Sequence, residues 1–289
     1  MSIAPRKGDS PKIDSHHHLW DLSRFHYDWM PPGDSIIKRD YLPADLEPLL
    51  ERNGISATML VQAHESVEEA EWLLDLFAAH DFIAGVVAWV DLASPDVGYV
   101  LDRLMARGGL VGIRHGAEHD ADPEWLTRDA SIQGLREVAA RDLAYDVLTR
   151  PHQLWQIPSL AERVPGLRIV VDHISKPPIA TGEIEPWAAD IARVAAIPGI
   201  YCKLSGMVTE ADHSAWTPED MKPYAEHVLE VFGPGRLMFG SDWPVSLLAA
   251  PYEDVLAAAL EAVRPQSAED TALLMGGNAI DFYGLGIAT

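Results

Sequence analysis

A (β/α)8 barrel is the fold that the sequence predicts, and three observations support it. The chain has 289 residues, a length that suits two ordinary domains or one large barrel. Eight short runs rich in Val, Ile and Leu alternate with segments of helical spacing, which is typical of parallel strands buried on both faces and joined by helices. No Ser/Gly linker, charge block or low-complexity tract divides the chain. We therefore expect one α/β domain over residues 1–289, in which residues 1–11 form a flexible N-terminal extension.

The eight expected strands are these apolar runs, most of which are continuously apolar and not strictly alternating. They span Lys12–Asp14, Thr58–Ala63, Ala84–Val90, Leu110–Arg114, Leu143–Leu148, Arg168–Asp172, Ile200–Leu204 and Leu237–Phe239. A doubly wound open sheet is the alternative α/β fold, but no glycine-rich phosphate-binding loop follows the first run.

Helices are expected between the strands. Val67–His80 places an apolar stripe opposite acidic residues. Pro43–Asn53 stops at Gly54, a residue suited to left-handed backbone geometry. Thr217–Asp220 has the pattern of a helix start, with a capping hydroxyl, a proline at the first helical position and two acids facing the helix dipole. Pro251–Val263 is expected to form an alanine-rich helix after the last strand.

The composition narrows the class of protein. The chain is 48% hydrophobic and 23% charged, and its 44 acidic against 22 basic residues give a net charge of −22. Nucleic acids and anionic membrane surfaces would be repelled, and no apolar run approaches the roughly 18–20 residues of a membrane span. A single cysteine, Cys202, fits a reducing compartment. We expect a cytoplasmic protein with a small-molecule substrate, and assembly into a homo-oligomer is compatible with this composition.

Polar residues at the first strand end indicate a metal site. Side chains two positions apart on a strand share a face, so His16 and His18 are expected to point together into the barrel mouth while His17 points away. Two imidazoles at this spacing can chelate one divalent cation, with zinc the typical choice. The alternative reading is an ordinary polar strand end or the remnant of a purification tag.

Two further strand ends supply candidates for the same site. His173 follows the sixth run and Asp242 follows the eighth. Because strand ends of a barrel converge at one face, these residues can join His16 and His18 in a site of three nitrogens and one carboxylate. A structural histidine is the alternative for His173 taken alone.

Several motifs together resemble the amidohydrolase superfamily, and within it the sugar-lactone hydrolase branch that includes fuconolactonase-like enzymes and is related to the pyrone-dicarboxylate lactonases. The resemblance runs from about Lys12 to Leu285. The motifs are Ile13–Trp20, Tyr27–Met30, Val61–Ala63, Gly112–His115, Arg150–Leu154, Asp172–Pro177, Lys203–Gly206, Phe239–Pro244 and Gly277–Leu285.

This resemblance implies a barrel of the metallo-dependent-hydrolase type. It assigns the general base to Asp242 and the first-strand metal ligands to His16 and His18, and it puts His173 beside the reacting centre. The fourth strand end reads Arg114–His115 and has no bridging lysine, so one divalent metal or none is expected. In a metal-free site, His173 would polarise the substrate carbonyl.

The substrate contacts are expected near the same strand ends. Arg114 and Lys203, with Arg150 and Lys176 nearby, predict a locally positive pocket for a carboxylate-bearing substrate or product; pairing with the abundant acids is the alternative. The other candidates are polar or aromatic residues of these motifs, for which loop placement or core packing is the competing interpretation. They are Gln62, His115, His152, Trp29 and Trp243.

The resulting hypothesis is an enzyme of carbohydrate metabolism that opens a fucono-, rhamnono- or galactono-type lactone to its aldonic acid. Asp242 would activate the water, with or without a bound metal. A decarboxylase or hydro-lyase acting on an unsaturated or aromatic acid is the second hypothesis, because the superfamily scaffold carries such chemistry. A non-catalytic barrel that binds a metal or a sugar is the third.

Overall fold

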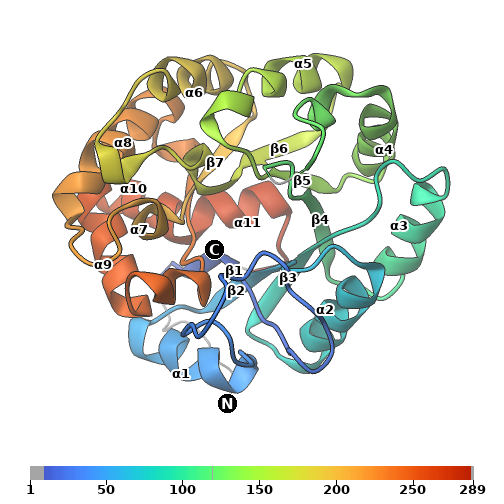
Figure 1. The fold of residues 1–289 in the computed structure, drawn as a ribbon, viewed down its shortest axis with the longest axis horizontal. Helices are drawn as coiled ribbons and strands as arrows, with labels where there is room; N and C mark the ends of the chain where they lie inside the picture. Colours follow the sequence, from blue (N-terminus) through green and yellow to red (C-terminus); the bar gives the residue numbers. More distant parts are fainter. Residues whose placement is uncertain (1–9, 119, 288–289) are drawn as a thin grey trace.

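Eight parallel strands in the order β1 to β8 form a single sheet in the computed structural model, which describes residues 10–118 and 120–287. The strands are β1 (Ile13–His17), β2 (Ala57–Val61), β3 (Ile83–Ala88), β4 (Leu110–His115), β5 (Ala144–Val147), β6 (Arg168–Val171), β7 (Tyr201–Leu204) and β8 (Leu237–Phe239). Backbone bonds join the two ends of the sheet, because His18 donates to the carbonyl of Trp243 (2.7 Å) and Asp242 to that of His16 (2.8 Å). The predicted (β/α)8 barrel is thereby confirmed, with its strands at the centre of the molecule (Figure 1).

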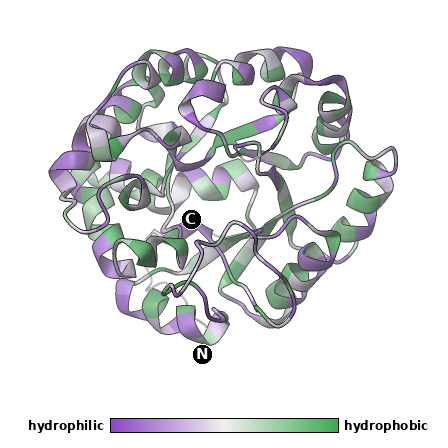
Figure 2. Cartoon of the chain, viewed as in Figure 1, coloured by the Kyte–Doolittle hydropathy of each residue, from purple (hydrophilic) through white to green (hydrophobic). Residues whose placement is uncertain are grey.

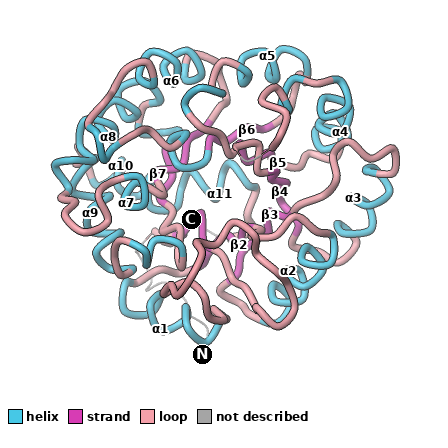
Figure 3. The backbone as a smooth tube through the Cα atoms, viewed as in Figure 1, coloured by secondary structure: helices cyan, strands magenta, loops and turns pink. Residues whose placement is uncertain are grey.

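Most of the helices surround the strands as an outer ring, whereas the last one lies across the centre (Figure 3). They are α1 (Pro43–Asn53), α2 (Val67–Ala79), α3 (Val97–Met105), α4 (Asp129–Ala140), α5 (Gln156–Arg163), α6 (Trp187–Ala195), α7 (Met207–Glu210), α8 (Pro218–Phe232), α9 (Tyr252–Val263), α10 (Ala268–Ala272) and α11 (Asn278–Tyr283). Within the described ranges, no helix is long and apolar enough to cross a membrane. Most of the predicted N-terminal extension, residues 1–9, lies outside the described part of the chain.

The local signals in the sequence largely mark the true element ends. Helix α1 stops before Gly54, whose φ is 65°, and α8 begins after Thr217, whose N–H donates to the Asp220 carboxylate at 2.7 Å. Helix α9 begins at Tyr252, one residue later than predicted, because Pro251 has the extended backbone of a cap. Strand β1 continues to His17, beyond the apolar run that predicted it.

The barrel interior is apolar at the N-terminal end of the strands. Six strands contribute to this apolar cluster, β2 with three residues and the others with one each: Ile13, Ala57, Met59, Val61, Val87, Ala144, Val170 and Met238. Helix α11 closes this end, since Ala279, Ile280, Phe282 and Tyr283 belong to the same cluster, and Figure 1 shows it crossing the centre of the barrel. A larger apolar core lies between strands and helices, where Figure 2 shows apolar residues along the strands. Among the described residues, this apolar cluster leaves the C-terminal end of the strands to the polar side chains of the interior.

Candidate active site

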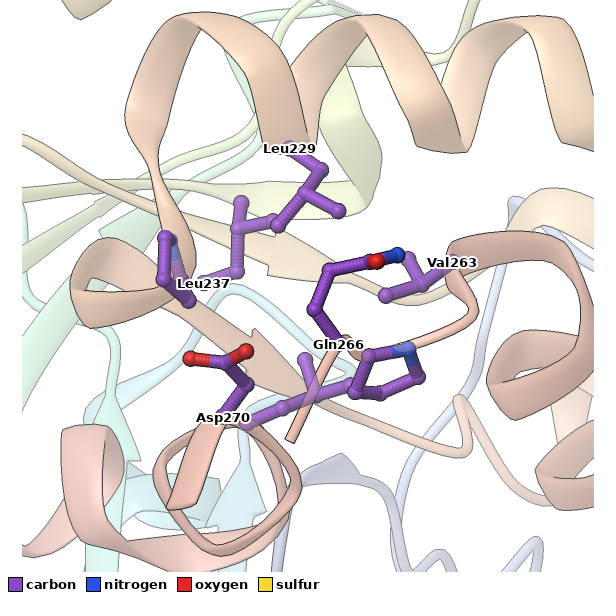
Figure 4. Close-up of a pocket in the computed structure, with 8 residues that line it drawn as sticks. Leu229, Leu237, Val263, Gln266 and Asp270 are labelled. Atoms are coloured by element: carbon purple, nitrogen blue, oxygen red, sulfur yellow. The ribbon is translucent and has the colours of Figure 1, made fainter. Parts of the chain in front are cut away.

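A cavity of about 790 Å³ opens at the C-terminal ends of the strands. Its lining includes residues at or just beyond the ends of six strands: His18, Gln62, Arg114, Leu148, His173 and Asp242. A second cavity, of about 110 Å³, lies beside Leu237 at the opposite end of β8, and its lining is mostly apolar (Figure 4). The larger cavity is the candidate active site, because titratable side chains from separate strands converge on it.

The four predicted metal-site residues lie together at this cavity, and all four are buried. His18, His173 and Asp242 belong to its lining, and His16 lies directly behind them. Oδ1 of Asp242 lies 3.4 Å from Nε2 of His18 and 3.9 Å from Nε2 of both His16 and His173. The Nε2 atoms of His16 and His18 are 3.2 Å apart. The structure thus brings together the side chains that the sequence placed on three different strand ends.

An irregularity in β1 gives the histidine pair its direction. The register between β1 and β2 shifts between Asp14 and His17, so Ile13 and His16 both face the interior although they are three positions apart. His17 points away, as predicted, and its Nε2 lies 2.8 Å from the hydroxyl of Thr58.

A left-handed turn carries His173 over the site. The four residues from His173 to Lys176 all have φ between 47° and 59°, a conformation that costs about 1–2 kcal/mol per residue for L-amino acids. The indole N–H of Trp187 donates to the carbonyl of Ile174 at 2.7 Å, and Lys176 N–H donates to that of His173 at 2.7 Å. Such strain is typical of functional sites and is held in place by the surrounding contacts.

Two glycines let neighbouring strands approach the histidine rings. Gly206 has φ +62°, and a Cβ there would lie 2.7 Å from Nδ1 of His173, which also contacts the Ser205 hydroxyl at 2.8 Å. At Gly240, a Cβ would lie 2.6 Å from Cβ of His16. Any other residue at either position would displace a ring of the site.

A charged layer lies directly beneath the histidines. Nζ of Lys203 is 2.5 Å from Oδ2 of Asp146 and 3.1 Å from Oδ1 of Asp172, and all three residues are fully buried. Arg114 lies 3.4 Å from Oδ2 of Asp172. From below, the hydroxyl of Tyr283 donates to Asp146 at 2.8 Å, so this layer joins the site to α11.

The sequence analysis missed three members of this layer. Asp172 lies two positions after the interior residue Val170, and Asp146 lies two positions after Ala144, so strand alternation could have identified both. Tyr283 has no such signal, because its role depends on where the last helix folds back under the barrel.

Burial keeps the site histidines neutral. It lowers the pKa of His16 well below its usual range, and Lys203 acts in the same direction. Burial likewise lowers the pKa of His173, by a large amount, and of His18. Burial raises the pKa of Asp146 to about 6, against the opposing effect of Lys203. A neutral imidazole has one ring nitrogen with a free lone pair, the form that binds metals.

The donor set fits a divalent cation. Ligand atoms of His16, His18 and Asp242 lie within 4.8 Å of one another, as do those of His16, Asp172 and His173. His18 donates its Nδ1–H to the carbonyl of Val61 at 2.9 Å, which leaves Nε2 free to bind a metal. Imidazole and carboxylate donors suit zinc. These residues form a candidate His/Asp metal site.

The predicted substrate-binding residues divide into two groups. Trp29, Gln62, Arg114 and His115 line the cavity; the Trp29 side chain is 38% exposed, and His115 stacks on Trp125 at 3.7 Å. The structure does not bring the other three to the described lining. Lys203 is buried in the charged layer, Trp243 packs against Tyr41 in the core, and His152 is exposed outside the cavity.

The cavity is not the positive pocket that the sequence led us to expect. Its described lining has three basic and five acidic residues: Arg114, Arg150, Lys176, Asp28, Glu65, Glu118, Asp120 and Asp242. Lys176 and Arg150 both contact Glu118, at 2.5 and 2.9 Å. Arg150 also contacts Glu210 at 3.0 Å, and Arg114 is paired with Asp172 as described above. Acids therefore engage all three of these cations.

A barrel with histidines after its first and sixth strands and an aspartate after its eighth is typical of the amidohydrolase class of hydrolases. The chain belongs to this family, because the family model described as Amidohydrolase matches residues 13–285. It is 38% identical over 278 residues to an L-fucono-1,5-lactonase of Burkholderia ambifaria, covering 94% of this chain and 95% of that protein. An L-fucono-1,5-lactonase of Burkholderia multivorans is 37% identical over 288 residues, covering 95% and 96%. The crystal structure of an amidohydrolase from Burkholderia multivorans with bound zinc superimposes with a TM-score of 0.87 at 35% identity, covering 95% of this chain and 99% of that one.

Proposed function

We propose that this chain hydrolyses an uncharged sugar lactone, of the fucono, rhamnono or galactono type, to its aldonic acid. The observation that carries the proposal is a carboxylate, Asp242, beside three neutral imidazoles at a cavity in which every cation of the described lining contacts an acid. The L-fucono-1,5-lactonases that match almost the whole chain support it, as does a partial match, 28% identical over 126 residues, to an L-rhamnono-gamma-lactonase. The single buried cysteine supports action in the cytoplasm.

Asp242 is assigned the role of general base. A water beside its Oδ1 loses a proton to the carboxylate as the water oxygen bonds to the carbonyl carbon of the lactone. Arg114, whose guanidinium lines the cavity, stabilises the charge that develops on the carbonyl oxygen. When the bond from the carbonyl carbon to the ring oxygen breaks, the proton held by Asp242 passes to that oxygen, which becomes a hydroxyl group of the acid. His173 lies 3.9 Å from Oδ1 of Asp242 and orients the reacting groups.

One divalent cation, with zinc as the candidate, would be held by His16, His18, His173 and Asp242, and when bound it supplies Lewis-acid polarisation of the carbonyl. The bound zinc in the Burkholderia multivorans structure supports this choice. Without a metal, His173 and Arg114 provide the polar contacts to the carbonyl. Trp29 offers an exposed ring face to the sugar, and Gln62 offers an amide to its hydroxyl groups.

The charge of the cavity favours the lactone over the alternative substrates. A decarboxylase or hydro-lyase of the second hypothesis binds an anionic acid, whose full negative charge is best held by a cation that is not already paired with an acid. Arg150, Lys176 and Arg114 each have a carboxylate partner. A neutral lactone needs no such cation.

A pH-indicator assay over L-fucono-, L-rhamnono- and L-galactono-lactones tests the proposal. We expect turnover of at least one lactone, and a loss of about 10²–10⁴-fold in kcat for Asp242→Asn, the usual contribution of a general base. The control is Asp281→Asn, an exposed position on α11 at the other end of the barrel. Unchanged turnover in Asp242→Asn would remove the assigned base, and absence of turnover on every lactone would remove the function.

A further inference from the structure

Three acceptors surround the buried ammonium group of Lys203. Its Nζ lies 2.5 Å from Oδ2 of Asp146, 3.1 Å from Oδ1 of Asp172 and 3.2 Å from Nδ1 of His16. All four residues are fully buried, so solvent does not compete for these contacts. A lysine ammonium has three N–H donors and no lone pair. Two of these contacts, to Oδ2 of Asp146 and to Nδ1 of His16, have hydrogen-bond geometry. Oδ1 of Asp172 is an ion-pair partner of Lys203 but accepts no hydrogen bond.

This contact determines where His16 carries its own proton. A neutral imidazole has a single N–H, and a nitrogen that accepts from Lys203 does not also carry hydrogen. The proton of His16 is then on Nε2, 3.2 Å from Nε2 of His18. His18 can accept it, because its own Nδ1–H donates to the carbonyl of Val61 at 2.9 Å. Donors and acceptors match along the whole path from Lys203 to Val61.

The opposite tautomer of His16 has more distant partners. With the proton on Nδ1, the ring would donate to Oδ1 of Asp172 at 3.5 Å while facing the ammonium of Lys203. Its Nε2 would then accept from Nη1 of Arg114 at 3.3 Å. Arg114 also donates from Nη1 to Oδ2 of Asp172 and from Nη2 to the carbonyl of Gln62, so its guanidinium has acceptors with either tautomer of His16. The shorter contact on each ring nitrogen therefore favours a proton on Nε2.

This preference opposes metal binding at His16. A histidine ligand normally donates its remote N–H to a carboxylate or carbonyl and presents the bare nitrogen to the metal. His18 follows that rule, whereas His16 presents an N–H. We propose that Lys203 is a positioning residue that holds His16 in its Nε2–H tautomer, so that the site binds divalent cations weakly. A cation can bind His16 only after the proton moves to Nδ1, toward Asp172. The inference goes beyond the proposed function, because it concerns metal affinity and not lactone turnover.

Zinc affinity in two variants tests this role of Lys203. The double variant K203M/D146N removes the ammonium and neutralises the carboxylate that would be left unpaired, while Asp172 remains to accept from His16. The matched control, D146N, keeps Lys203. Affinity is measured on the metal-depleted full chain at one fixed pH, by competition with a chromophoric chelator. We expect the Kd for Zn²⁺ to fall about 10- to 100-fold in the double variant, the usual range for partners of metal-bound histidines, and not to fall in D146N. A folded double variant with unchanged or weaker affinity, or an equal gain in D146N, would overturn the proposal.

The tautomer can also be read without changing Lys203 or Asp146. Long-range ¹H–¹⁵N correlation spectra of the metal-free wild-type chain distinguish Nε2–H from Nδ1–H, and the His16→Gln variant assigns the signal. We expect Nε2–H for His16 and a shift to Nδ1–H when zinc is added. A proton on Nδ1 of His16 before zinc is added refutes the proposal even where the double variant does not fold. Neither measurement uses a lactone, so failure of the lactone assay and failure of this proposal are separate results.

Discussion

Replacing Gly206 with alanine tests whether close packing over His173 sets the geometry of the site. The added Cβ would lie 2.7 Å from Nδ1, 2.8 Å from Cγ and 3.1 Å from Cβ of His173. Non-bonded heavy atoms prefer separations of about 3.5–4.0 Å, so the imidazole must move by roughly 1 Å to relieve the contact. That movement also stretches the 2.8 Å contact from Nδ1 to the Ser205 hydroxyl.

The magnitudes follow from two separate costs. Alanine at the left-handed φ of +62° costs about 1–2 kcal/mol, and overpacking against the ring adds about 1–3 kcal/mol. We therefore expect Gly206→Ala to reduce the free energy of unfolding by about 2–5 kcal/mol. Because a displacement of roughly 1 Å at a reacting group costs about 10²-fold in rate, kcat/KM for the preferred lactone should fall by about that factor.

Gly54→Ala is the matched control for backbone cost. Gly54 has φ +65°, and a Cβ there would meet nothing within 4 Å. It lies at the end of α1, so this variant should lose about 1–2 kcal/mol with unchanged kcat/KM. Urea unfolding and the lactone assay measure both quantities. If Gly206→Ala is no less stable than Gly54→Ala and equally active, the contact with His173 does not position the ring, and the reasoning is refuted.

Three further predictions concern charge and metal. Burial raises the pKa of Glu69 to about 8, against the opposing hydrogen bonds from His64 and Ala63. In the unfolded chain this carboxyl ionises from about pH 4.5, so between pH 4.5 and 8 the unfolded state releases a proton that the folded state keeps. The free energy of unfolding of the wild type should therefore fall relative to that of Glu69→Gln as pH rises, by at most about 1.4 kcal/mol per pH unit. Urea unfolding at pH 5.5 and 7.5 measures this difference, and an equal difference at both values would contradict it. A lactone that carries a carboxylate should have a kcat/KM at least about tenfold below that of its neutral counterpart, since a like-charge contact worth about 1.4 kcal/mol corresponds to a factor of ten. Glu118→Gln should bring the two kcat/KM values closer together. A ratio unchanged by that substitution would count against the charge argument. Zinc should raise the melting temperature of wild type but not of His18→Asn, because that variant loses a candidate ligand; an equal rise in both would place the metal elsewhere.

The sequence predicts the barrel and the floor of the site because both depend on local periodicity. Continuous apolar runs identify buried strands, and a strand end identifies where His16, His18, His173 and Asp242 point. A positive pocket was predicted because the sequence locates the lysine and arginine residues near the strand ends but does not locate the acids that pair with them. Glu118, which engages Lys176 and Arg150, lies in a loop whose path no periodic pattern determines. Tyr283 reaches the charged layer only because α11 folds back beneath it.

The charge distribution links substrate choice to product release. Hydrolysis of a lactone converts an uncharged molecule into a carboxylate, so the charge appears only after the reaction. The described lining of the cavity has five acids against three cations, and each of those cations already faces an acid. Like charges a few ångströms apart near a protein surface repel by about 1–4 kcal/mol, a cost that falls on the product and not on the substrate. By this argument, the acids that favour a neutral lactone over an anionic acid are also expected to weaken the binding of the aldonate and so to favour its release.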